Sequence, residues 1–342
     1  MFLTVTPNPC IERTVTLDGF QPGQVHRVPP AMLRVNAGGK GINAARVAAR
    51  LGCETLAIGW VGRRQAAWFQ AQLESEGVPY DLVEVEPDTR ITINILKAEG
   101  GGFQKTEIVE AGNPLGITDG TRLLEKFAAL LPRASLVAIC GSYPPTPDGS
   151  SLGSSPDATF DAHLTLLTHL ARRSGVRVIV DGKGRPFGMV VRSKQPPWCI
   201  KPNLDEAAEL LHRPIVGEAA ERRAIRDMLG FGVEVILLSC GARGAYLGTA
   251  GGTWFLPAPV VREVSPVGSG DALVGAFAAR FLETQDLLEA ARWGVAAGAA
   301  NASQLMPAFC QRANVEALLP EVQARPHILM LDVDGSAQPQ SL

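Results

Sequence analysis

The segment Val264-Ser265-Pro266-Val267-Gly268-Ser269-Gly270-Asp271 joins an apolar stretch to a helix of small residues that starts around Ala272. The glycines at 268 and 270 allow the backbone to turn tightly and to approach a ligand closely. The amides of residues 268–271 would be free donors at a helix N-terminus, which suits an anion. Asp271 among these donors predicts a carboxylate that takes a proton from a hydroxyl while the amides hold a phosphoryl group. The alternative is an acid that only complements the helix dipole, and this segment alone favours neither.

The composition is that of a folded protein with a sizeable core: 342 residues, 46% of them hydrophobic and 19% charged. A net charge of −2 argues against a nucleic-acid partner. No stretch approaches the roughly 18 apolar residues of a membrane span, and the start, MFLTVTPNP, lacks the basic region of a signal peptide. The six cysteines have no metal-binding spacing, which favours buried free thiols in a reducing cytoplasm. We therefore expect a cytoplasmic protein that binds neither membrane nor nucleic acid.

Short apolar runs alternate with helical patterns along most of the chain. This alternation predicts an α/β fold with a doubly wound, mostly parallel sheet flanked by helices. The predicted strands are residues 2–6, 55–61, 136–140, 177–180, 198–200 and 235–239. The predicted helices are residues 42–51, 66–76, 121–131, 160–174, 204–211 and 219–229. Ligands of such sheets bind beyond the carboxyl ends of the strands, so the polar loops at 141–142, 181–182, 201–203 and 239–241 should line one site.

Two stretches, residues 10–35 and 83–109, break the alternation because they are rich in β-branched residues and turn signals. We expect them to form a small β-sheet that lies over the strand ends as a lid. The main nucleotide-binding and catalytic domain would then comprise residues 1–9, 36–82 and 110–330. Residues 149–158 have the composition of a surface insertion, and residues 331–342 that of a flexible tail.

The second glycine cluster is Asn36-Ala37-Gly38-Gly39-Lys40-Gly41-Ile42-Asn43, and with Ala44 it matches a dinucleotide fingerprint. That fingerprint should follow the first strand directly, whereas roughly thirty residues separate this cluster from residues 2–6. A Walker A motif is absent because both Gly-Lys pairs are followed by Gly instead of Ser or Thr. An NADP-dependent oxidoreductase is therefore the weaker alternative.

Taken together, this cluster and Gly268-Ser269-Gly270-Asp271 resemble the paired signatures of the ribokinase-like (PfkB) carbohydrate kinases in both order and separation. The resemblance runs from about residue 1 to 320 and implies the ribokinase-like fold and a kinase that uses ATP and Mg²⁺. It implies Asp271 as the general base and the amides of Gly268, Ser269, Gly270 and Asp271 as the anion hole. It also implies a homodimer formed by pairing of two lids, whose exposed strand edges need a partner.

The nucleotide site is implied by two further motifs. Lys201-Pro202-Asn203-Leu204-Asp205-Glu206 resembles the family's KPNxxE segment, with Lys201 and Asn203 near the nucleotide and Glu206 acting on Mg²⁺ through water. The same residues predict a helix start in which Asn203 and Glu206 form a capping box, and both interpretations can hold. The segment from Ser239 to Gly244 resembles the nucleotide loop, with Ser239, Gly241 and Gly244 close to ATP, and a hairpin turn is its alternative.

The N-terminal half contains Thr6-Pro7-Asn8-Pro9, Gly23-Gln24-Val25-His26-Arg27, Thr89-Arg90 and Thr106-Glu107-Ile108. With these segments it resembles the phosphohexose branch of the family, that is, the 1-phosphofructokinases, the tagatose-6-phosphate kinases and the minor 6-phosphofructokinase. This implies phosphorylation of fructose 1-phosphate or tagatose 6-phosphate to the 1,6-bisphosphate. Arg27 and Arg90 would bind the phosphate already on the sugar, since guanidinium recognises phosphate bidentately. The residues implied for the sugar itself are Glu12, Gly38, Gly39, Asn43 and Ser142. The family normally has Asp at position 12, so the longer Glu12 leaves the sugar isomer open.

Other functions also stay open at this point. The sequence is compatible with a kinase of fructose 6-phosphate, or of an unphosphorylated sugar or nucleoside. It is also compatible with a non-catalytic sugar-phosphate-binding protein, although the intact Asp271 counts against that.

Overall fold

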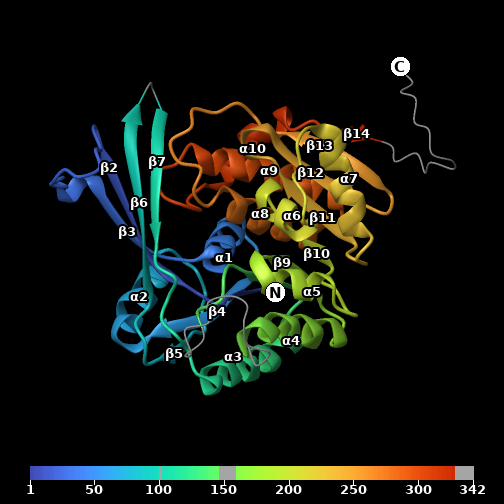
Figure 1. The fold of residues 1–342 in the computed structure, drawn as a ribbon, viewed down its shortest axis with the longest axis horizontal. Coiled ribbons are helices and arrows are strands. Elements are labelled where there is room, and N and C mark those ends of the chain that lie inside the picture. The colour runs from blue at the N-terminus through green and yellow to red at the C-terminus, as the bar shows by residue number, and fades with distance from the viewer. Residues whose placement is uncertain (100–101, 146–158, 328–342) are drawn as a thin grey trace.

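The computed structural model describes residues 1–99, 102–145 and 159–327, and it has the predicted α/β architecture (Figure 1). Within these residues, ten strands form one large sheet. From edge to edge they are β14 (Arg325–His327), β13 (Gly252–Pro257), β12 (Gly244–Thr249), β11 (Val235–Ser239), β10 (Cys199–Ile200), β9 (Arg177–Asp181), β8 (Leu136–Cys140), β1 (Phe2–Thr6), β4 (Thr55–Gly62) and β5 (Val83–Val85). The strands from β5 to β11 are parallel, and β12, β13 and β14 continue the sheet antiparallel.

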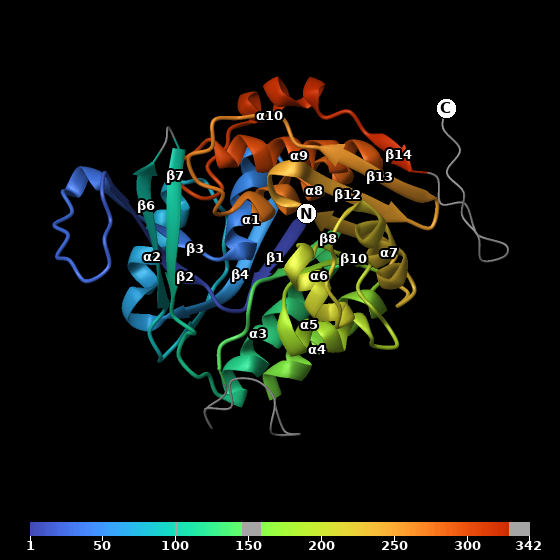
Figure 2. The ribbon, with the colours of Figure 1, turned by 45° about the horizontal axis from the view of Figure 1, so that its top comes forward.

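Helices cover both faces of the large sheet (Figure 2). One face carries α1 (Lys40–Arg50), α2 (Arg63–Ser75), α8 (Ser269–Thr284), α9 (Leu287–Ala302) and α10 (Arg312–Leu318); the other carries α3 (Ile117–Leu130), α4 (Thr159–Arg173), α5 (Gly184–Val191), α6 (Leu204–Leu211) and α7 (Glu218–Leu229). Single 3₁₀ turns are η1 (Pro30–Met32), η2 (Leu131–Arg133), η3 (Gly241–Arg243) and η4 (Leu319–Glu321). Because both faces are covered, the central strand β1 is buried along its whole length.

The predicted strands and helices are present, but several helices begin a few residues earlier than predicted. Hydrophobic periodicity starts at the first buried side chain, whereas a helix starts at its capping residue, so the pattern locates the N-terminus late. The sequence analysis did not predict α5, α9, α10 or the strands β12 to β14. Helix α9 is buried on almost every side, and such a helix has no polar face to reveal its period.

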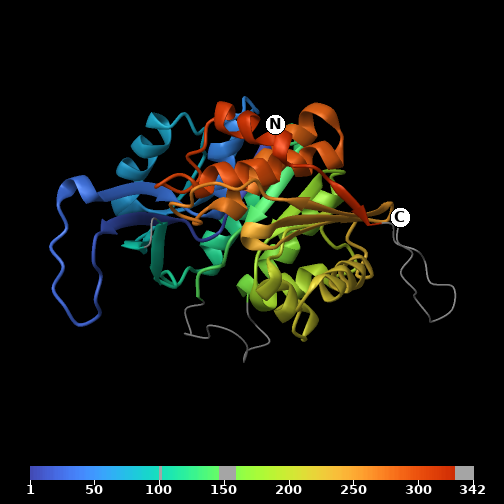
Figure 3. The ribbon, with the colours of Figure 1, turned by 90° about the horizontal axis from the view of Figure 1, so that it is seen from above.

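A second sheet has the order β3-β2-β6-β7 and lies at the end of the molecule opposite β14 (Figure 3). Its strands are β3 (Leu33–Gly38), β2 (Cys10–Leu17), β6 (Arg90–Glu99) and β7 (Gly102–Val109). Residues at alternate positions point to one buried face, and the strand register places Glu12 beside Thr92 and Thr14 beside Asn94 there. We call this four-stranded unit the small sheet.

The small sheet has slightly different limits from the predicted lid. Residues 83–85 form β5, which pairs with β4 at the edge of the large sheet, so the second lid segment begins at Arg90. Strand β3 continues to Gly38, beyond the predicted limit of 35. The division into two domains stays a prediction, and the predicted insertion at 149–158 and tail at 331–342 lie outside the described residues.

The cysteines are free thiols, and all are buried except the half-buried Cys53. Among the residues that the structure describes, no helix is both long and apolar enough to cross a membrane.

Candidate active site

A cavity of about 600 Å³ lies between the small sheet and the carboxyl ends of the parallel strands. All four predicted polar loops line it, because the carboxyl ends of β8, β9, β10 and β11 meet at one edge of the sheet. The predicted site residues along its wall are Glu12, Gly39, Asn43, Arg90, Ser142, Lys201, Asn203, Glu206, Ser239, Gly241, Gly244, Gly268, Ser269, Gly270 and Asp271. One cavity therefore connects the residues predicted for the sugar with those predicted for the nucleotide.

Two predicted residues do not line this cavity. Arg27 is exposed in the connection between β2 and β3, which extends away from the rest of the molecule (Figure 3). Gly38 is buried behind Glu12, and a Cβ atom at position 38 would overlap the Glu12 carboxyl group. Gly38 thus makes room for Glu12, and the structure gives it no contact with the cavity.

Asp271 sits in the first turn of α8, directly after the turn that the two glycines form. Gly268 has a left-handed φ of 80°, and a side chain there would collide with Pro307. Asp271 is only 7% exposed, and its Oδ2 accepts a hydrogen bond of 2.8 Å from Asn43 Nδ2. Burial raises the pKa of Asp271 to about 7, and nearby Asp181 adds to the increase, whereas Lys40 and Asn43 oppose it. A carboxylate with this pKa is matched to general-base catalysis near neutral pH.

Lys40 is one of the charged cavity residues to which the sequence analysis gave no role, along with Lys105, Lys183 and Glu263. Lys40 Nζ lies 3.0 Å from Asp181 Oδ1 and 3.6 Å from Glu206 Oε1, and Lys201 Nζ lies 3.5 Å from the same Asp181 oxygen. Burial alone would lower the pKa of Lys40, but the carboxylates of Asp181, Glu206 and Asp271 raise it above the ordinary value. Lys40 is therefore a fixed positive charge beside Asp271. Its position inside the glycine cluster was the available signal.

The nucleotide motifs have the local structures that were named as alternatives. Asn203 Oδ1 accepts from the Glu206 amide at 2.8 Å, and Glu206 Oε2 accepts from the Asn203 amide at 2.9 Å, which completes the capping box of α6. Residues 239–245 form a hairpin turn between β11 and β12. Both motifs nevertheless line the cavity, so the structural and the functional interpretations are compatible.

At the opposite end, side chains of the small sheet form the wall. Glu12 Oε2 accepts from Asn36 Nδ2 at 2.9 Å, and burial raises the pKa of this carboxyl group. The Arg90 guanidinium donates from Nη2 to the Asn8 carbonyl at 3.0 Å and from Nη1 to the Glu110 carbonyl at 2.9 Å. Five N–H groups are available on an arginine, so Arg90 keeps donors for a ligand in the cavity.

Residues 6–314 match the pfkB family of carbohydrate kinases. The chain belongs to this family. Phosphofructokinase-2 from Escherichia coli, solved with substrates and products, is 25% identical, with a TM-score of 0.81 over 94% of this chain and 99% of that chain. A Staphylococcus aureus protein described as a phosphofructokinase is also 25% identical, with a TM-score of 0.75 over 96% and 99% of the two chains. A Thermotoga maritima protein described as a 1-phosphofructokinase shares the fold at 22% identity, with a TM-score of 0.84 over 95% and 99%.

The PfkB family and the phosphofructokinase neighbours make this protein a sugar-phosphate kinase with a ribokinase-like fold, as the sequence resemblance implied. Such a kinase uses ATP and typically a divalent metal ion. Other structures of phosphofructokinase-2 from Escherichia coli include a complex with potassium and a tetrameric inhibited form.

The charged side chains of the cavity of this PfkB kinase suit a divalent cation that is bound together with phosphate. Among the described residues, five basic and six acidic side chains line it. Asp181 Oδ2 is buried and has no hydrogen-bond partner in the part of the chain that the structure describes, and the Glu206 carboxylate lines the same wall. Among the described residues, no group of three or more His, Cys, Asp or Glu side chains could hold a metal alone. Mg²⁺ usually takes one or two carboxylates, several waters and phosphate oxygens, and this donor set fits that preference.

Proposed function

We propose that the enzyme transfers the γ-phosphate of MgATP to a hydroxyl group of fructose 1-phosphate or tagatose 6-phosphate, giving the 1,6-bisphosphate. The observation that carries the proposal is the position of Asp271. This buried carboxyl group, with its pKa raised to about 7, lies at the N-terminus of α8 between the two ends of one cavity. A base at that point can reach a sugar hydroxyl while the helix amides face the phosphoryl group.

Asp271 accepts the proton of the attacking hydroxyl as the new bond forms between the hydroxyl oxygen and the γ-phosphorus. The bond between the γ-phosphorus and the β–γ bridging oxygen breaks, and ADP leaves. The amides of Gly268, Ser269, Gly270 and Asp271 stabilise the charge that develops on the transferring group. Phosphoryl transfer depends mainly on positioning and electrostatics, and fixed donors at a helix N-terminus supply both.

The lysines beside Asp271 bind the nucleotide phosphates directly, and the carboxylates act on them through a metal ion. Lys40 and Lys201 supply positive charge, and Asp181 and Glu206 would hold Mg²⁺, Glu206 through water. The bound ion supplies charge neutralisation between the phosphate groups. The wall at the ATP end of the cavity is formed by Asn203, Ser239, Gly241 and Gly244.

The sugar occupies the end that the small sheet covers. Glu12, Gly39, Asn43 and Ser142 surround it, and Arg90 binds the phosphate that it already carries. Closure of the small sheet would exclude water and limit hydrolysis of ATP.

Arg27 can join Arg90 only if the connection between β2 and β3 moves or if a second copy supplies it. We propose a homodimer through the small sheet, whose edge strand β7 carries the exposed apolar residues Ile108 and Val109.

The test is ADP release with MgATP and fructose 1-phosphate, tagatose 6-phosphate, fructose 6-phosphate, fructose or ribose, for the native enzyme and for Asp271→Asn. We expect turnover of one of the first two phosphohexoses and a loss of about 10²-fold or more in the variant. Turnover of fructose 6-phosphate alone would keep the mechanism and change the substrate. Turnover restricted to fructose or ribose would overturn the role given to Arg90. A fully active Asp271→Asn variant would overturn the proposed mechanism.

A further inference from the structure

Arg46 is the largest side chain that is fully buried in the described part of the chain. It lies on α1, one turn after Asn43, and does not line the cavity. Its Nε donates to Glu76 Oε2 at 2.7 Å, its Nη1 to Asn43 Oδ1 at 2.6 Å and its Nη2 to the Ala37 carbonyl at 2.5 Å. A buried guanidinium with this many fixed partners holds one geometry, because any other would leave buried polar groups unpaired.

The contact with Asn43 decides which way its side-chain amide points. Arginine has donors and no acceptor, so only the oxygen of the Asn43 amide can face it. The nitrogen of the same amide then faces Asp271, and Nδ2 donates to Asp271 Oδ2 at 2.8 Å. In the flipped orientation, the amide oxygen would face the carboxylate and repel it. Arg46 therefore sets the polarity of the hydrogen bond that Asp271 receives.

Arg46 also contacts the segment that supports the turn before Asp271. Its guanidinium lies 5.0 Å from the centre of the Phe309 ring. The preceding residue, Ala308, donates its amide to Asn301 Oδ1 at 2.6 Å, and Asn301 Nδ2 donates to Ser269 Oγ at 3.0 Å. Arg46 thus contacts both Asn43, which bonds Asp271 directly, and the segment that holds the turn before Asp271.

We propose that Arg46 is a positioning residue for phosphoryl transfer: through Asn43, and with Glu76 as its counter-ion, it holds the Asp271 carboxylate in the orientation that accepts the substrate proton. This inference rests on the role proposed above for Asp271. It adds a buried chain of hydrogen bonds from Glu76, at the end of α2, through Arg46 and Asn43 on α1 to Asp271 on α8. Of the described residues that line the cavity, neither Glu76 nor Arg46 is one.

The pH dependence of catalysis should reveal whether these hydrogen bonds act on Asp271. The ionisable groups that face Asp271 are Lys40 on α1, Glu12 on β2 and Asp181 on β9. Those that face Arg46 are Glu76, Arg50 and the same Glu12. The neighbouring thiols Cys10 and Cys140 have their pKa raised by burial and stay neutral. The bond from Asn43 favours the ionised form of Asp271 and lowers its pKa. Loss of Arg46 should weaken that bond and move the acid limb of activity to higher pH.

The experiment compares Arg46→Met with the native enzyme, using MgATP and the most active sugar phosphate of the panel above. We expect kcat to fall by about 10- to 100-fold, the midpoint of the acid limb of kcat/KM to rise by about one pH unit, and KM for MgATP to stay within about twofold. Arg46→Lys keeps the charge and loses the planar fork, so it should restore part of kcat.

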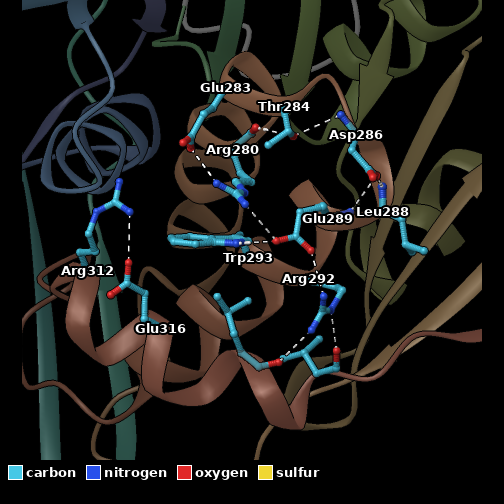
Figure 4. Close-up of polar contacts among 12 residues, drawn as sticks. Arg280, Glu283, Thr284, Asp286, Leu288, Glu289, Arg292, Trp293, Arg312 and Glu316 are labelled. Carbon is cyan, nitrogen blue, oxygen red and sulfur yellow. Dashed lines mark hydrogen bonds and ion pairs between the residues drawn. The ribbon is translucent and has the colours of Figure 1, made fainter.

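Arg292 offers a matched control on α9 (Figure 4). Its guanidinium also bonds a glutamate, Glu289 at 2.9 Å, and two backbone carbonyls, but among the described residues none of these partners lines the cavity, whereas Asn43, a partner of Arg46, does. Arg292→Met should lower stability and leave the pH profile unchanged.

A double-mutant comparison separates positioning from packing. If Arg46 acts through Asn43, Arg46→Met should lower kcat little further in an Asn43→Ala background. Additive losses, or an Arg46→Met enzyme with an unchanged acid limb, would overturn the inference. If Arg46→Met does not fold, Glu76→Gln and Arg46→Lys carry the same test, because each weakens the chain without removing the side chain. If Asp271→Asn is inactive but Arg46→Met leaves the acid limb unchanged, only the positioning role of Arg46 is rejected. If Asp271→Asn is active, the role of Asp271 as general base is rejected as well.

Discussion

At the scale of single residues, the environment of Asp271 decides what the cavity can do. The carboxyl group is held from one side by Asn43, faced by the fixed charge of Lys40, and otherwise removed from water. An exposed aspartate in the first turn of a helix would be ionised at neutral pH and could complement the dipole only. Burial raises the proton affinity of Asp271 enough for it to act as a base. Burial of the ionised carboxylate also lowers the stability of the folded protein.

The first prediction concerns the pH dependence of activity. Because the free enzyme holds the pKa of Asp271 at about 7, the ionised base becomes scarce below that pH. We expect kcat/KM for the sugar phosphate to fall to about a tenth of its plateau at pH 6, with a single protonation. The measurement is the initial rate at subsaturating sugar phosphate between pH 5 and 9. A flat profile would show that Asp271 does not titrate in this range.

The second prediction concerns stability. The pKa of Asp271 in the folded protein, about 7, lies above the value of about 4 in an unfolded chain. The folded state therefore binds this proton more tightly, and the free energy of unfolding falls as the pH rises from about 4 to 7. Asp271→Asn cannot ionise, and its amide oxygen can still accept from Asn43. At pH 8 it should be more stable than the native enzyme, by up to about 4 kcal/mol.

Urea unfolding at pH 8 and at pH 4 measures this difference. At pH 4, where the native carboxyl group is protonated in the folded state, the two proteins should differ little. A variant that is less stable at both pH values would show that the ionised Asp271 is not strained by burial.

At the scale of elements, the close packing of α1 against α8 brings Asn43 to Asp271. The two helices meet where Gly275 of α8 faces the backbone of α1, and a Cβ atom there would overlap the Ala44 carbonyl oxygen. Asn43 is the neighbour of Ala44, and Asp271 lies one turn before Gly275. Any increase in the distance between the helices therefore lengthens the hydrogen bond to the predicted base.

The third prediction is that Gly275→Ala lowers both stability and activity. The neighbour is backbone and cannot turn away, so the helices must separate, at a cost of about 1–3 kcal/mol. We expect a lower urea midpoint and a fall of about tenfold or more in kcat. Gly188 on α5 is the control, since a Cβ atom there would lie 3.2 Å from Arg192 Nη1, which is the end of a long side chain and not backbone. Gly188→Ala should keep activity and hold or raise stability. Equal behaviour of the two variants would contradict this account of the α1–α8 contact.

The elements also show what the sequence could and could not predict. A parallel sheet collects the carboxyl ends of its strands at one edge, so polar loops read from the sequence were enough to locate the cavity. Arg27 shows the opposite case, because a long connection without regular structure has no register from which its position follows. Arg46 lies four residues after Ile42, on the apolar side of α1. The helical periodicity of the sequence therefore already places this charged residue on a buried face. Its partner Glu76 is distant in sequence, and only the fold brings the two together.

At the scale of the whole molecule, the cavity has to bring together two ligands that both carry phosphate. Its walls hold five basic and six acidic side chains, so the protein alone does not neutralise that charge. The small sheet closes one end and the large sheet supplies the other, which reduces the screening of these charges by water. A divalent cation can balance this charge, since it would neutralise phosphate oxygens while Asp181 and, through water, Glu206 hold it, as proposed above.

The fourth prediction follows from this charge balance. Removal of divalent metal with a chelator should abolish phosphoryl transfer and weaken the binding of ATP by about tenfold or more. Glu206→Gln should raise the Mg²⁺ concentration needed for half-maximal rate, and its amide can still accept the capping bond from Asn203. Binding of the sugar phosphate, measured by calorimetry without nucleotide, should not depend on the metal, because we propose that its phosphate binds to Arg90, at the end of the cavity that the small sheet covers. ATP that binds equally well with and without Mg²⁺ would show that Lys40 and Lys201 suffice, and the proposed metal site would then be wrong.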